Sequence, residues 1–194
     1  MNRNLGFKVR IMLLMVASGI SNAYCVMNFK TPVTHHTGNA TAIVLSISDS
    51  KRLIFLLAIF GLFFLGSVVG TYTTYEENFR RGFLCLAVLA IISTSVGEYA
   101  VYLLTFIFGF QNSLFLKYEG ALIRSTHITG YLTDSAAIIG KYLRTKDSSR
   151  LHVSIFFLIS IGFFILGGIL YFYVKSFSQI LVALIYLILA CIWR

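Results

Sequence analysis

The chain has 194 residues, of which 58% are hydrophobic and only 12% are charged. A soluble domain carries roughly a quarter of its residues as charged side chains, so this composition excludes a water-soluble fold. The net charge of +9 does not indicate nucleic-acid binding, because the bases fall between apolar runs, where they orient membrane helices. The composition therefore predicts a multi-pass, all-α membrane protein whose first partner is the lipid bilayer, with no nucleic-acid partner.

Six charge-free apolar runs predict six transmembrane helices, at 11–29, 53–75, 82–97, 99–116, 153–174 and 176–193. Each is close to the roughly 20 residues that cross a bilayer core. Read as one helix, 82–116 would be about 50 Å long, too long for a single span. We place the break at Val96-Gly97-Glu98, where a glycine and the only charge of the stretch allow a tight turn.

The first apolar run has two interpretations. Lys8 and Arg10 precede it, and Ser21-Asn22-Ala23 follows, as in a signal peptide with a small-x-small cleavage site. The alternative is a retained transmembrane helix. The second half of the chain favours the retained helix, because a similar block recurs there in mid-chain, where no signal peptidase acts.

Two segments, 31–48 and 125–140, are rich in hydroxyl groups and do not match the spans. They share the pattern T-H-x-T-G-x-x-T, at 34–41 and 126–133. Upstream of each, a G-x-x-N block lies inside an apolar run, at 19–22 and 109–112. The order of elements also repeats, so we expect two pseudo-symmetric membrane repeats, 1–98 and 99–194, that form one compact domain.

The two polar segments are predicted to be short helices that either re-enter the membrane or span it poorly. In the first, Ala40, Ile43, Val44 and Ile47 fall at the spacing of an amphipathic helix of about three turns. Thr37 and Thr129 are the expected N-caps, and Gly38 and Gly130 would allow a close backbone approach.

Smaller motifs favour packing over chemistry. Gly66-Ser67-Val68-Val69-Gly70 is a small-xxx-small motif, typical of a helix contact. Cys25, Cys85 and Cys191 lie singly in apolar runs without disulfide or zinc-site spacing, so we interpret them as small buried hydrophobes.

The block from Asn22 to Thr41, together with Gly109-Phe110-Gln111-Asn112 and Thr129-Gly130-Tyr131-Leu132-Thr133, resembles the YoaK-like bacterial membrane proteins. The resemblance covers most of the chain and implies an integral membrane protein of bacterial type. That family is a domain of unknown function, so it implies no substrate and no catalytic residues. The chain departs from the expected pattern at His35-His36, which precede the first Thr-Gly pair.

Charge bias distinguishes two topologies. If the polar segments do not cross, six spans place twelve of the sixteen bases inside and both termini in the cytoplasm, and the repeats are inverted. If both cross, eight spans place ten bases inside, and the repeats are parallel. The six-span arrangement is favoured, with the inner (cytoplasmic) membrane as the location.

The polar groups suggest a central site for a small solute. Asn22 and Asn112 are amides in apolar runs and need partners, which the hydroxyls and backbone of the polar segments supply. The alternative is that these groups only satisfy one another in helix packing. The hypothetical substrate-binding residues are Asn22, Thr37, Gly38, Asn39, Asn112, Thr129 and Gly130.

Proton or ion coupling is assigned to His35, His127 and Asp134. Asp134 follows His127 by seven residues and would share its helix face, and an acid within a membrane indicates function. The alternative is a loop acid that pairs with Lys141 or Arg144. No metal or cofactor is expected, because no Cys or carboxylate accompanies the histidines at ligand spacing.

The sequence therefore predicts a small-solute transporter or channel with a polar site where two repeats meet. Two other functions are open. One is an intramembrane enzyme that uses His127 and Asp134, and the other is a non-catalytic partner in a membrane complex. An oligomer is compatible with all three functions.

Overall fold

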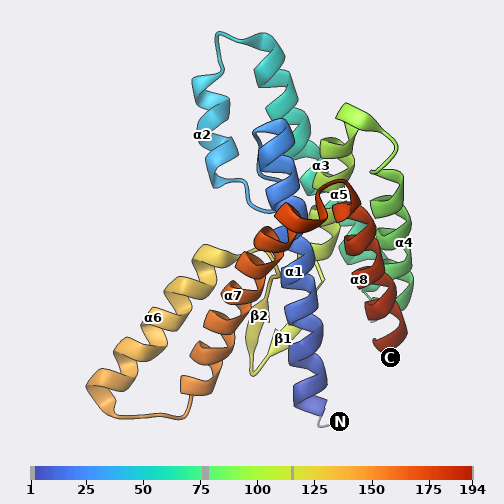
Figure 1. Ribbon diagram of the computed structural model, residues 1–194. Helices are drawn as coiled ribbons and strands as arrows, with labels where there is room; N and C mark the ends of the chain where they lie inside the picture. The colour runs from blue at the N-terminus through green and yellow to red at the C-terminus, as the bar shows by residue number, and fades with distance from the viewer. Residues whose placement is uncertain (1–2, 76–78, 115, 194) are drawn as a thin grey trace.

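The fold is described from a computed structural model that covers residues 3–75, 79–114 and 116–193. These residues form eight α-helices, two 3₁₀ turns and one β-hairpin (Figure 1). The elements are α1 (Arg3–Phe29), α2 (Thr37–Leu45), α3 (Ser50–Thr74), α4 (Phe79–Ile92), the turn Gly97–Tyr99, α5 (Ala100–Asn112), β1 (Leu116–Tyr118), β2 (Ala121–Ile123), α6 (Ile128–Thr145), α7 (Leu151–Val174), the turn Lys175–Phe177 and α8 (Ser178–Ile192).

Three helical stretches are long and apolar enough to cross a bilayer: Leu5–Phe29, Ser50–Thr74 and Leu151–Ile192. The third has 42 residues and would be about 63 Å long as one helix. It is instead two helices, because Lys175, the first residue of the 3₁₀ turn between them, has a positive φ of 41°, which interrupts the α-helix. Long apolar helices of this kind are those of a membrane-embedded, helical protein.

The expected break between the third and fourth apolar runs is confirmed. Helix α4 ends at Ile92 and α5 begins at Ala100. Gly97 lies between them with φ of +56°, a conformation that glycine adopts at little cost. Because the chain reverses here, α4 and α5 run in opposite directions (Figure 1).

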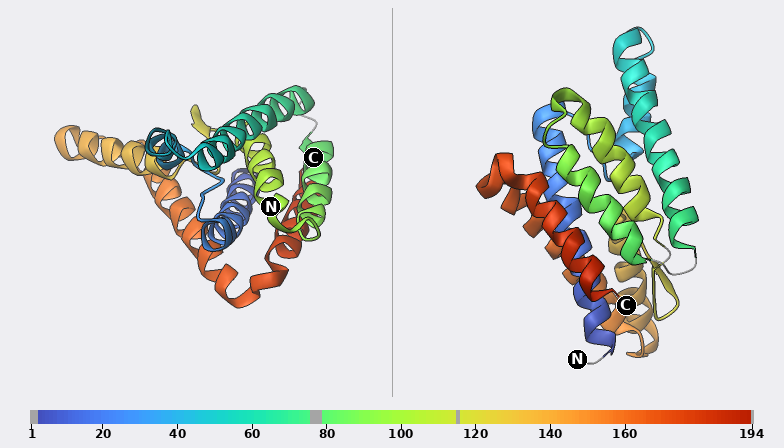
Figure 2. Two further views of the ribbon diagram at one scale, coloured as in Figure 1. Left: turned by 90° about the horizontal axis from the view of Figure 1, so that it is seen from above. Right: turned by 90° about the vertical axis from the view of Figure 1, so that its right-hand side faces the viewer.

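The helices pack in pairs that are distant in sequence. Helix α1 lies against α7, α3 lies against α5, and α4 lies against α8 (Figure 2). Helix α1 also contacts α5 and α8, so it occupies the middle of the bundle. At one end of the bundle, the guanidinium of Arg10 donates to the carbonyl of Ile192, which brings the two ends of the chain together.

Glycines allow the two long helix pairs to approach closely. A Cβ on Gly19 would lie 2.0 Å from the carbonyl oxygen of Phe164 on α7. The α3–α5 pair has the same kind of contact, because a Cβ on Gly109 would lie 2.1 Å from the carbonyl oxygen of Phe63. No real Cβ fits at such distances, so both pairs depend on glycine.

The small-xxx-small motif of α3 contributes to the same contact, as the sequence predicts. A Cβ on Gly66 would lie 2.2 Å from the Phe106 oxygen, and one on Gly70 would lie 2.7 Å from the Phe110 oxygen. The α1–α7 pair is tightened in turn by Gly167, whose Cβ would lie 2.2 Å from an α1 carbonyl.

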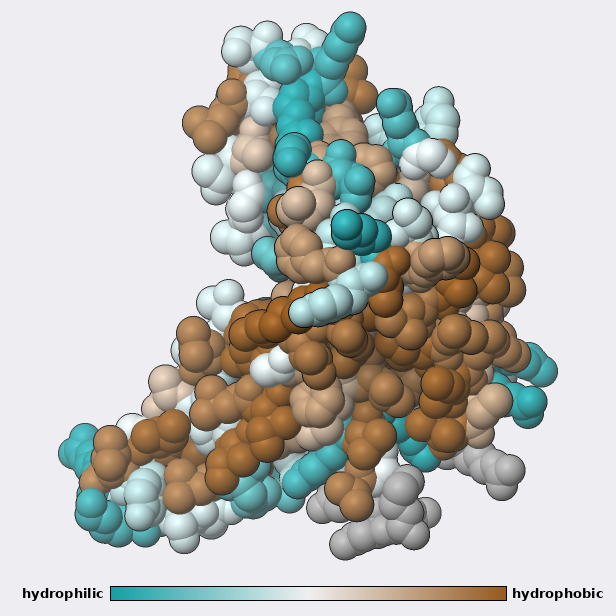
Figure 3. Space-filling model, viewed as in Figure 1, coloured by the Kyte–Doolittle hydropathy of each residue, from teal (hydrophilic) through white to brown (hydrophobic). Residues whose placement is uncertain are grey.

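Apolar residues cover the outside as well as the core. Figure 3 shows them over the middle of one face, while hydrophilic residues gather on the α2–α3 lobe at the top and near the chain ends at the bottom. Large side chains such as Phe64 and Ile54 are about 70% exposed, at 71% and 67%. Such a surface suits contact with lipid, since water would penalise it.

Three expectations about local structure are wrong. Helix α2 ends at Leu45, so Ile47 lies outside it, and Val44 and Ile47 are exposed by 64% and 69% instead of forming a buried face. Only Asn39 of this helix is buried. Cys25 is buried as expected, but Cys85 and Cys191 lie on the outer surface of α4 and α8.

The β-hairpin is a further difference from the sequence prediction. The fourth apolar run was expected to be helical to residue 116, but α5 ends at Asn112 and Leu116 pairs with Ile123 in an antiparallel ladder. The turn is at Glu119 and Gly120, both with positive φ. The sequence Tyr-Glu-Gly between apolar residues is a hairpin signal, and α5 has already ended before this hairpin begins.

The helix contact at Gly66 can be tested by a substitution of one methyl group. Gly66→Ala should lower the free energy of unfolding by about 1–3 kcal/mol, because the new Cβ meets backbone that cannot rotate away. The matched control is Gly61→Ala on the same helix, where a Cβ meets nothing within 4 Å. Unfolding in mixed micelles, followed by far-ultraviolet circular dichroism, measures both. Equal stability of the two variants would contradict the packing described here.

Candidate functional site

Asn22 fixes the chain segment that precedes α2. Its Oδ1 accepts hydrogen bonds from the backbone N–H of Val33 at 3.2 Å and the Thr34 hydroxyl at 2.9 Å. Helix α1 continues for seven residues past Asn22, to Phe29, which is about 10 Å along its axis. The chain must therefore turn back beside α1 before α2 begins, so the first polar segment re-enters the body of the protein.

Asn112 fixes the second polar segment in the same way. Its Oδ1 accepts a hydrogen bond from the Thr126 hydroxyl at 2.8 Å. Here the helix ends at the asparagine itself, and the β-hairpin occupies the intervening chain. The two asparagines thus obtain the hydroxyl partners that the sequence led us to expect. We call the Asn22–Thr34 and Asn112–Thr126 hydrogen bonds the two asparagine anchors.

Helices α2 and α6 start close to these anchors and leave in different directions. In Figures 1 and 2 both helices begin near the middle of the molecule, where their first turns lie near each other. Neither helix has a side-chain cap, and the N-cap positions are His36 and His127. Uncapped first turns leave backbone N–H groups free to bind a solute.

The expected caps Thr37 and Thr129 are therefore wrong. Both residues lie within the first turn of their helix and are exposed, because the anchored segment before each helix already positions the preceding histidine. Gly38 is also exposed, and a Cβ there would meet nothing within 4 Å. At Gly130 the neighbour is the ring of His127, whose Nδ1 would lie 2.3 Å from a Cβ.

Asn39 closes the loop that precedes α2. It is buried, and its Nδ2 donates to the Pro32 carbonyl at 2.9 Å and lies 3.1 Å from Nδ1 of His36. The His36 ring packs against Phe63 of α3, with ring centroids 4.3 Å apart. Asn39 is thus a structural residue of this loop, and Phe63 connects the start of α2 with the cavity described next.

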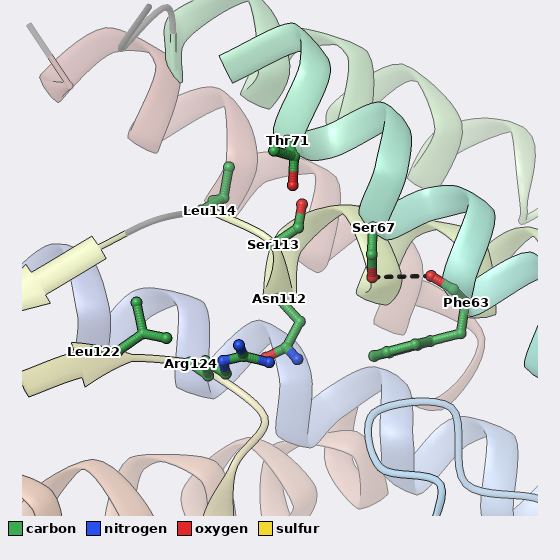
Figure 4. Close-up of a pocket in the computed structure, with 8 residues that line it drawn as sticks. All are labelled: Phe63, Ser67, Thr71, Asn112, Ser113, Leu114, Leu122 and Arg124. Atoms are coloured by element: carbon green, nitrogen blue, oxygen red, sulfur yellow. Dashed lines mark hydrogen bonds between the residues drawn. The ribbon is translucent and has the colours of Figure 1, made fainter. Parts of the chain in front are cut away.

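A polar cavity of about 190 Å³ lies between α3, the end of α5 and the strand β2. Figure 4 shows its lining residues: Phe63, Ser67, Thr71, Asn112, Ser113, Leu114, Leu122 and Arg124. We call it the Asn112 pocket. Of the predicted site residues, it contains Asn112 alone. Its hydroxyls, amide and guanidinium can hold a small polar solute by hydrogen bonds.

Arg124 is the charged group of the Asn112 pocket. Its guanidinium lies beside the Asn112 amide in Figure 4. The ion pairs found in the described part of the chain are Lys141–Asp147 at 3.4 Å and His152–Glu119, so no described carboxylate pairs with Arg124. Sequence reasoning counted this arginine only as a topological charge. Its position next to the T-H-x-T-G segment was the signal that could have identified it.

A buried hydrogen-bond network centres on Gln111, the residue before Asn112 of the pocket. Nε2 of Gln111 donates to the hydroxyls of Ser18 at 2.8 Å and Ser125 at 2.6 Å, and its Oε1 accepts from the Tyr186 hydroxyl at 2.6 Å. All four side chains are at most 3% exposed, and the amide is fully paired. This network, which joins α1, α5 and α8 to the segment before α6, was not predicted, although Gln111 lies directly before Asn112 in an apolar run.

The proposed coupling residues are not gathered in one place. His127 is the N-cap of α6, and its carbonyl accepts a hydrogen bond from the backbone N–H of Tyr131. Its place on a helical face shared with Asp134 stays a prediction. Asp134 is exposed on α6. Lys141, one of its expected partners, pairs with Asp147 instead. His35 lies next to the first anchor, with its Nδ1 3.1 Å from the Thr34 hydroxyl.

Comparison with known proteins gives one family. The model of a family described as "Protein of unknown function (DUF1275)" matches residues 11–193, almost the whole chain. No curated protein and no solved structure is detectably similar to the chain. The fold and the pocket are therefore the basis for any functional inference.

The half-buried His36, directly before α2, should make the fold sensitive to acid. Burial, with the neighbouring His35, lowers the pKa of His36 from 6.5 to about 4, and burial also lowers the pKa of His35. Below about pH 6.5 these histidines bind protons in the unfolded chain but stay neutral in the folded chain. The free energy of unfolding therefore decreases as the pH falls below about 6.5. Thermal unfolding in detergent between pH 7 and pH 5 measures this loss.

The matched variants are His36→Gln and the double variant His35→Gln with His36→Gln, neither of which titrates at the changed position. Each should reduce the loss of stability between pH 7 and pH 5, and the double variant should reduce it more. An identical pH dependence in the wild type and the double variant would show that the fold does not lower the pKa of these two rings.

Proposed function

The chain belongs to this family of proteins of unknown function, and we propose that it is a transporter or channel for a small polar solute in the bacterial inner membrane. The observation that carries the proposal is the pair of asparagine anchors. They hold two uncapped helix starts beside a polar pocket. A polar centre of this kind is costly to maintain in a membrane protein and typically serves a solute or ion.

We propose six spans, formed by α1, α3, α4, α5, α7 and α8. Helices α4, α5 and α8 have 14, 13 and 15 residues, about 20–23 Å against a core of about 30 Å. The adjoining 3₁₀ turns lengthen α5 and α8, and Arg80 and Arg81 can extend from the start of α4 to the headgroups. With both termini in the cytoplasm, this topology places twelve of sixteen bases inside.

The paired contacts support two inverted repeats, 1–98 and 99–194. The glycine of each G-x-x-N block packs on the partner helix, Gly19 on α7 and Gly109 on α3, and the asparagine three residues later makes the anchor. Helices α1 and α5, which carry these blocks, run in opposite directions in Figure 1. Equivalent contacts on helices of opposite direction are what an inverted repeat predicts.

Inverted repeats explain why the site would lie between the halves. Non-helical backbone at membrane depth is stable only where protein buries it or where it lines a wet cavity. The segments before α2 and α6 are non-helical, and the Asn112 pocket lies beside the second of them. We therefore propose that the solute passes between the two anchored segments and binds with Asn22, Asn39 and Asn112 close by, near the starts of α2 (Thr37, Gly38) and α6 (Thr129, Gly130).

Coupling to protons or ions is a separate part of the proposal. His35 contacts the hydroxyl of the first anchor, so a change in its protonation would reach Asn22 directly. His127 precedes α6 and packs on Gly130, close to the second anchor. We propose these two histidines, with Asp134 on the outer side of α6, as the groups that sense pH.

A bulky side chain in the Asn112 pocket should stop transport. Thr71→Phe places a ring in a cavity of about 190 Å³, so flux of the transported solute into sealed proteoliposomes should fall to the level of protein-free vesicles. The matched control is Thr73→Phe, two residues further along α3 and outside this pocket, which should keep wild-type flux. A panel of small neutral and anionic solutes identifies the solute.

Two outcomes would contradict the proposal. Equal flux in Thr71→Phe and the wild type would remove the pocket from the solute path. Folded protein that carries no solute of the panel, yet purifies with a stoichiometric membrane partner, would favour the non-catalytic assembly role.

A further inference from the structure

We infer that the Asn112 pocket selects a small anion and that Arg124 supplies the charge that recognises it. This inference rests on the proposed transport function and names the class of its substrate. Each polar group that lines the pocket and remains free to bind can donate a hydrogen bond, as the following contacts show.

The lining hydroxyls differ in their availability. The Ser67 hydroxyl is engaged with the carbonyls of Phe63 and Gly109, each at 3.0 Å, and the Ser113 hydroxyl donates to the Phe110 carbonyl at 2.7 Å. The Thr71 hydroxyl has no hydrogen-bond partner among the described residues, and Figure 4 shows it at the edge of the pocket, close to Ser113. It is therefore free to donate to a bound solute.

Asn112 presents its amide nitrogen to the pocket. Its Oδ1 is occupied by the Thr126 hydroxyl, so the acceptor end of the amide is used by the anchor. Within the described residues, Nδ2 has no acceptor. The anchor thus fixes the orientation of the amide, with the donor end left for the solute.

Arg124 adds a fixed positive charge beside this amide. A guanidinium presents a planar fork of donors that matches an oxyanion in two parallel hydrogen bonds. Of the described acids of the second half, Glu119 pairs with His152 and Asp147 pairs with Lys141, and the exposed Asp134 forms no ion pair with Arg124. No acidic side chain is among the residues that line the pocket. Arg124 is an exposed side chain, and an anion is the solute that its charge attracts to the pocket.

The size of the pocket limits the anion. A cavity of about 190 Å³ is smaller than the roughly 300–1,000 Å³ that drug-sized ligands occupy. It suits an oxyanion of a few non-hydrogen atoms, such as nitrate or a short carboxylate. The phosphate of a lipid headgroup offers the same oxygens, so the experiment must separate a free anion from a lipid.

The experiment compares nitrate with urea, a neutral planar molecule of the same size. Nitrate remains ionised at any working pH and does not leak through the bilayer as a neutral acid. Flux of both into sealed proteoliposomes is measured for the wild type, Arg124→Gln, Arg124→Lys and the control Lys117→Gln. Lys117 lies on β1, is exposed, and is outside the pocket.

Nitrate flux should fall about tenfold or more in Arg124→Gln, the loss expected for one charge-assisted hydrogen-bond pair. Arg124→Lys should be intermediate, because it keeps the charge and loses the fork. Lys117→Gln should behave as the wild type, and urea flux should not fall in any variant. Nitrate titration in maltoside micelles, which contain no phosphate, should show the same order of affinities, and circular dichroism confirms that each variant is folded.

Three results separate the inference from the function on which it rests. Equal flux of nitrate and urea, unchanged in Arg124→Gln, would overturn the anion site and leave transport intact. Nitrate binding that depends on Arg124, without flux of any solute, would support the anion site and contradict transport. Phospholipid that co-purifies with the wild type and is lost from Arg124→Gln, with no nitrate binding, would make the pocket a headgroup site and overturn the inference.

Discussion

An amide inside an apolar helix must find a hydrogen-bond partner, and this requirement organises the protein. Asn22 and Asn112 meet it by accepting from Thr34 and Thr126. Each hydrogen bond holds the segment that precedes α2 or α6 beside the asparagine of the earlier helix, so the chain returns to the bundle at that point. Shortly after each anchored residue, a helix (α2 or α6) begins, and the backbone N–H groups of its first turn have no side-chain cap. Without the anchors, neither α2 nor α6 would have a fixed starting point.

The anchors in turn depend on close helix packing. Gly19 and Gly109, each one turn before its asparagine, let α1 approach α7 and α5 approach α3 at distances that no side chain permits. Apolar attraction between helices is weak in lipid, so such contacts and internal hydrogen bonds supply the stability. The network around Gln111 adds a second layer of hydrogen bonds between α1, α5 and α8. The Asn112 pocket is the space that this packing leaves open.

The features of the fold that could be predicted from the sequence are those that depend on residues close together in the chain. Apolar runs predicted the helices, Gly97 with Glu98 predicted the break, and the need of Asn22 and Asn112 for partners predicted the anchors. Long-range packing decided the rest. Arg124 looked like a topological charge until the hairpin placed it beside Asn112. The exposure of Cys85 and Cys191 also followed from which helix faces became paired, which the order of residues in an apolar run does not specify.

The central claim is that the two halves enter the membrane from opposite sides, each with its own anchored segment. Single cysteines at Lys51, at the start of α3, and Arg144, near the end of α6, test it in a background without Cys25, Cys85 and Cys191. A membrane-impermeant thiol reagent should label Lys51→Cys in intact cells and Arg144→Cys only after the cytoplasmic face is opened. Labelling of both positions from the same face would contradict the inverted arrangement and favour eight spans.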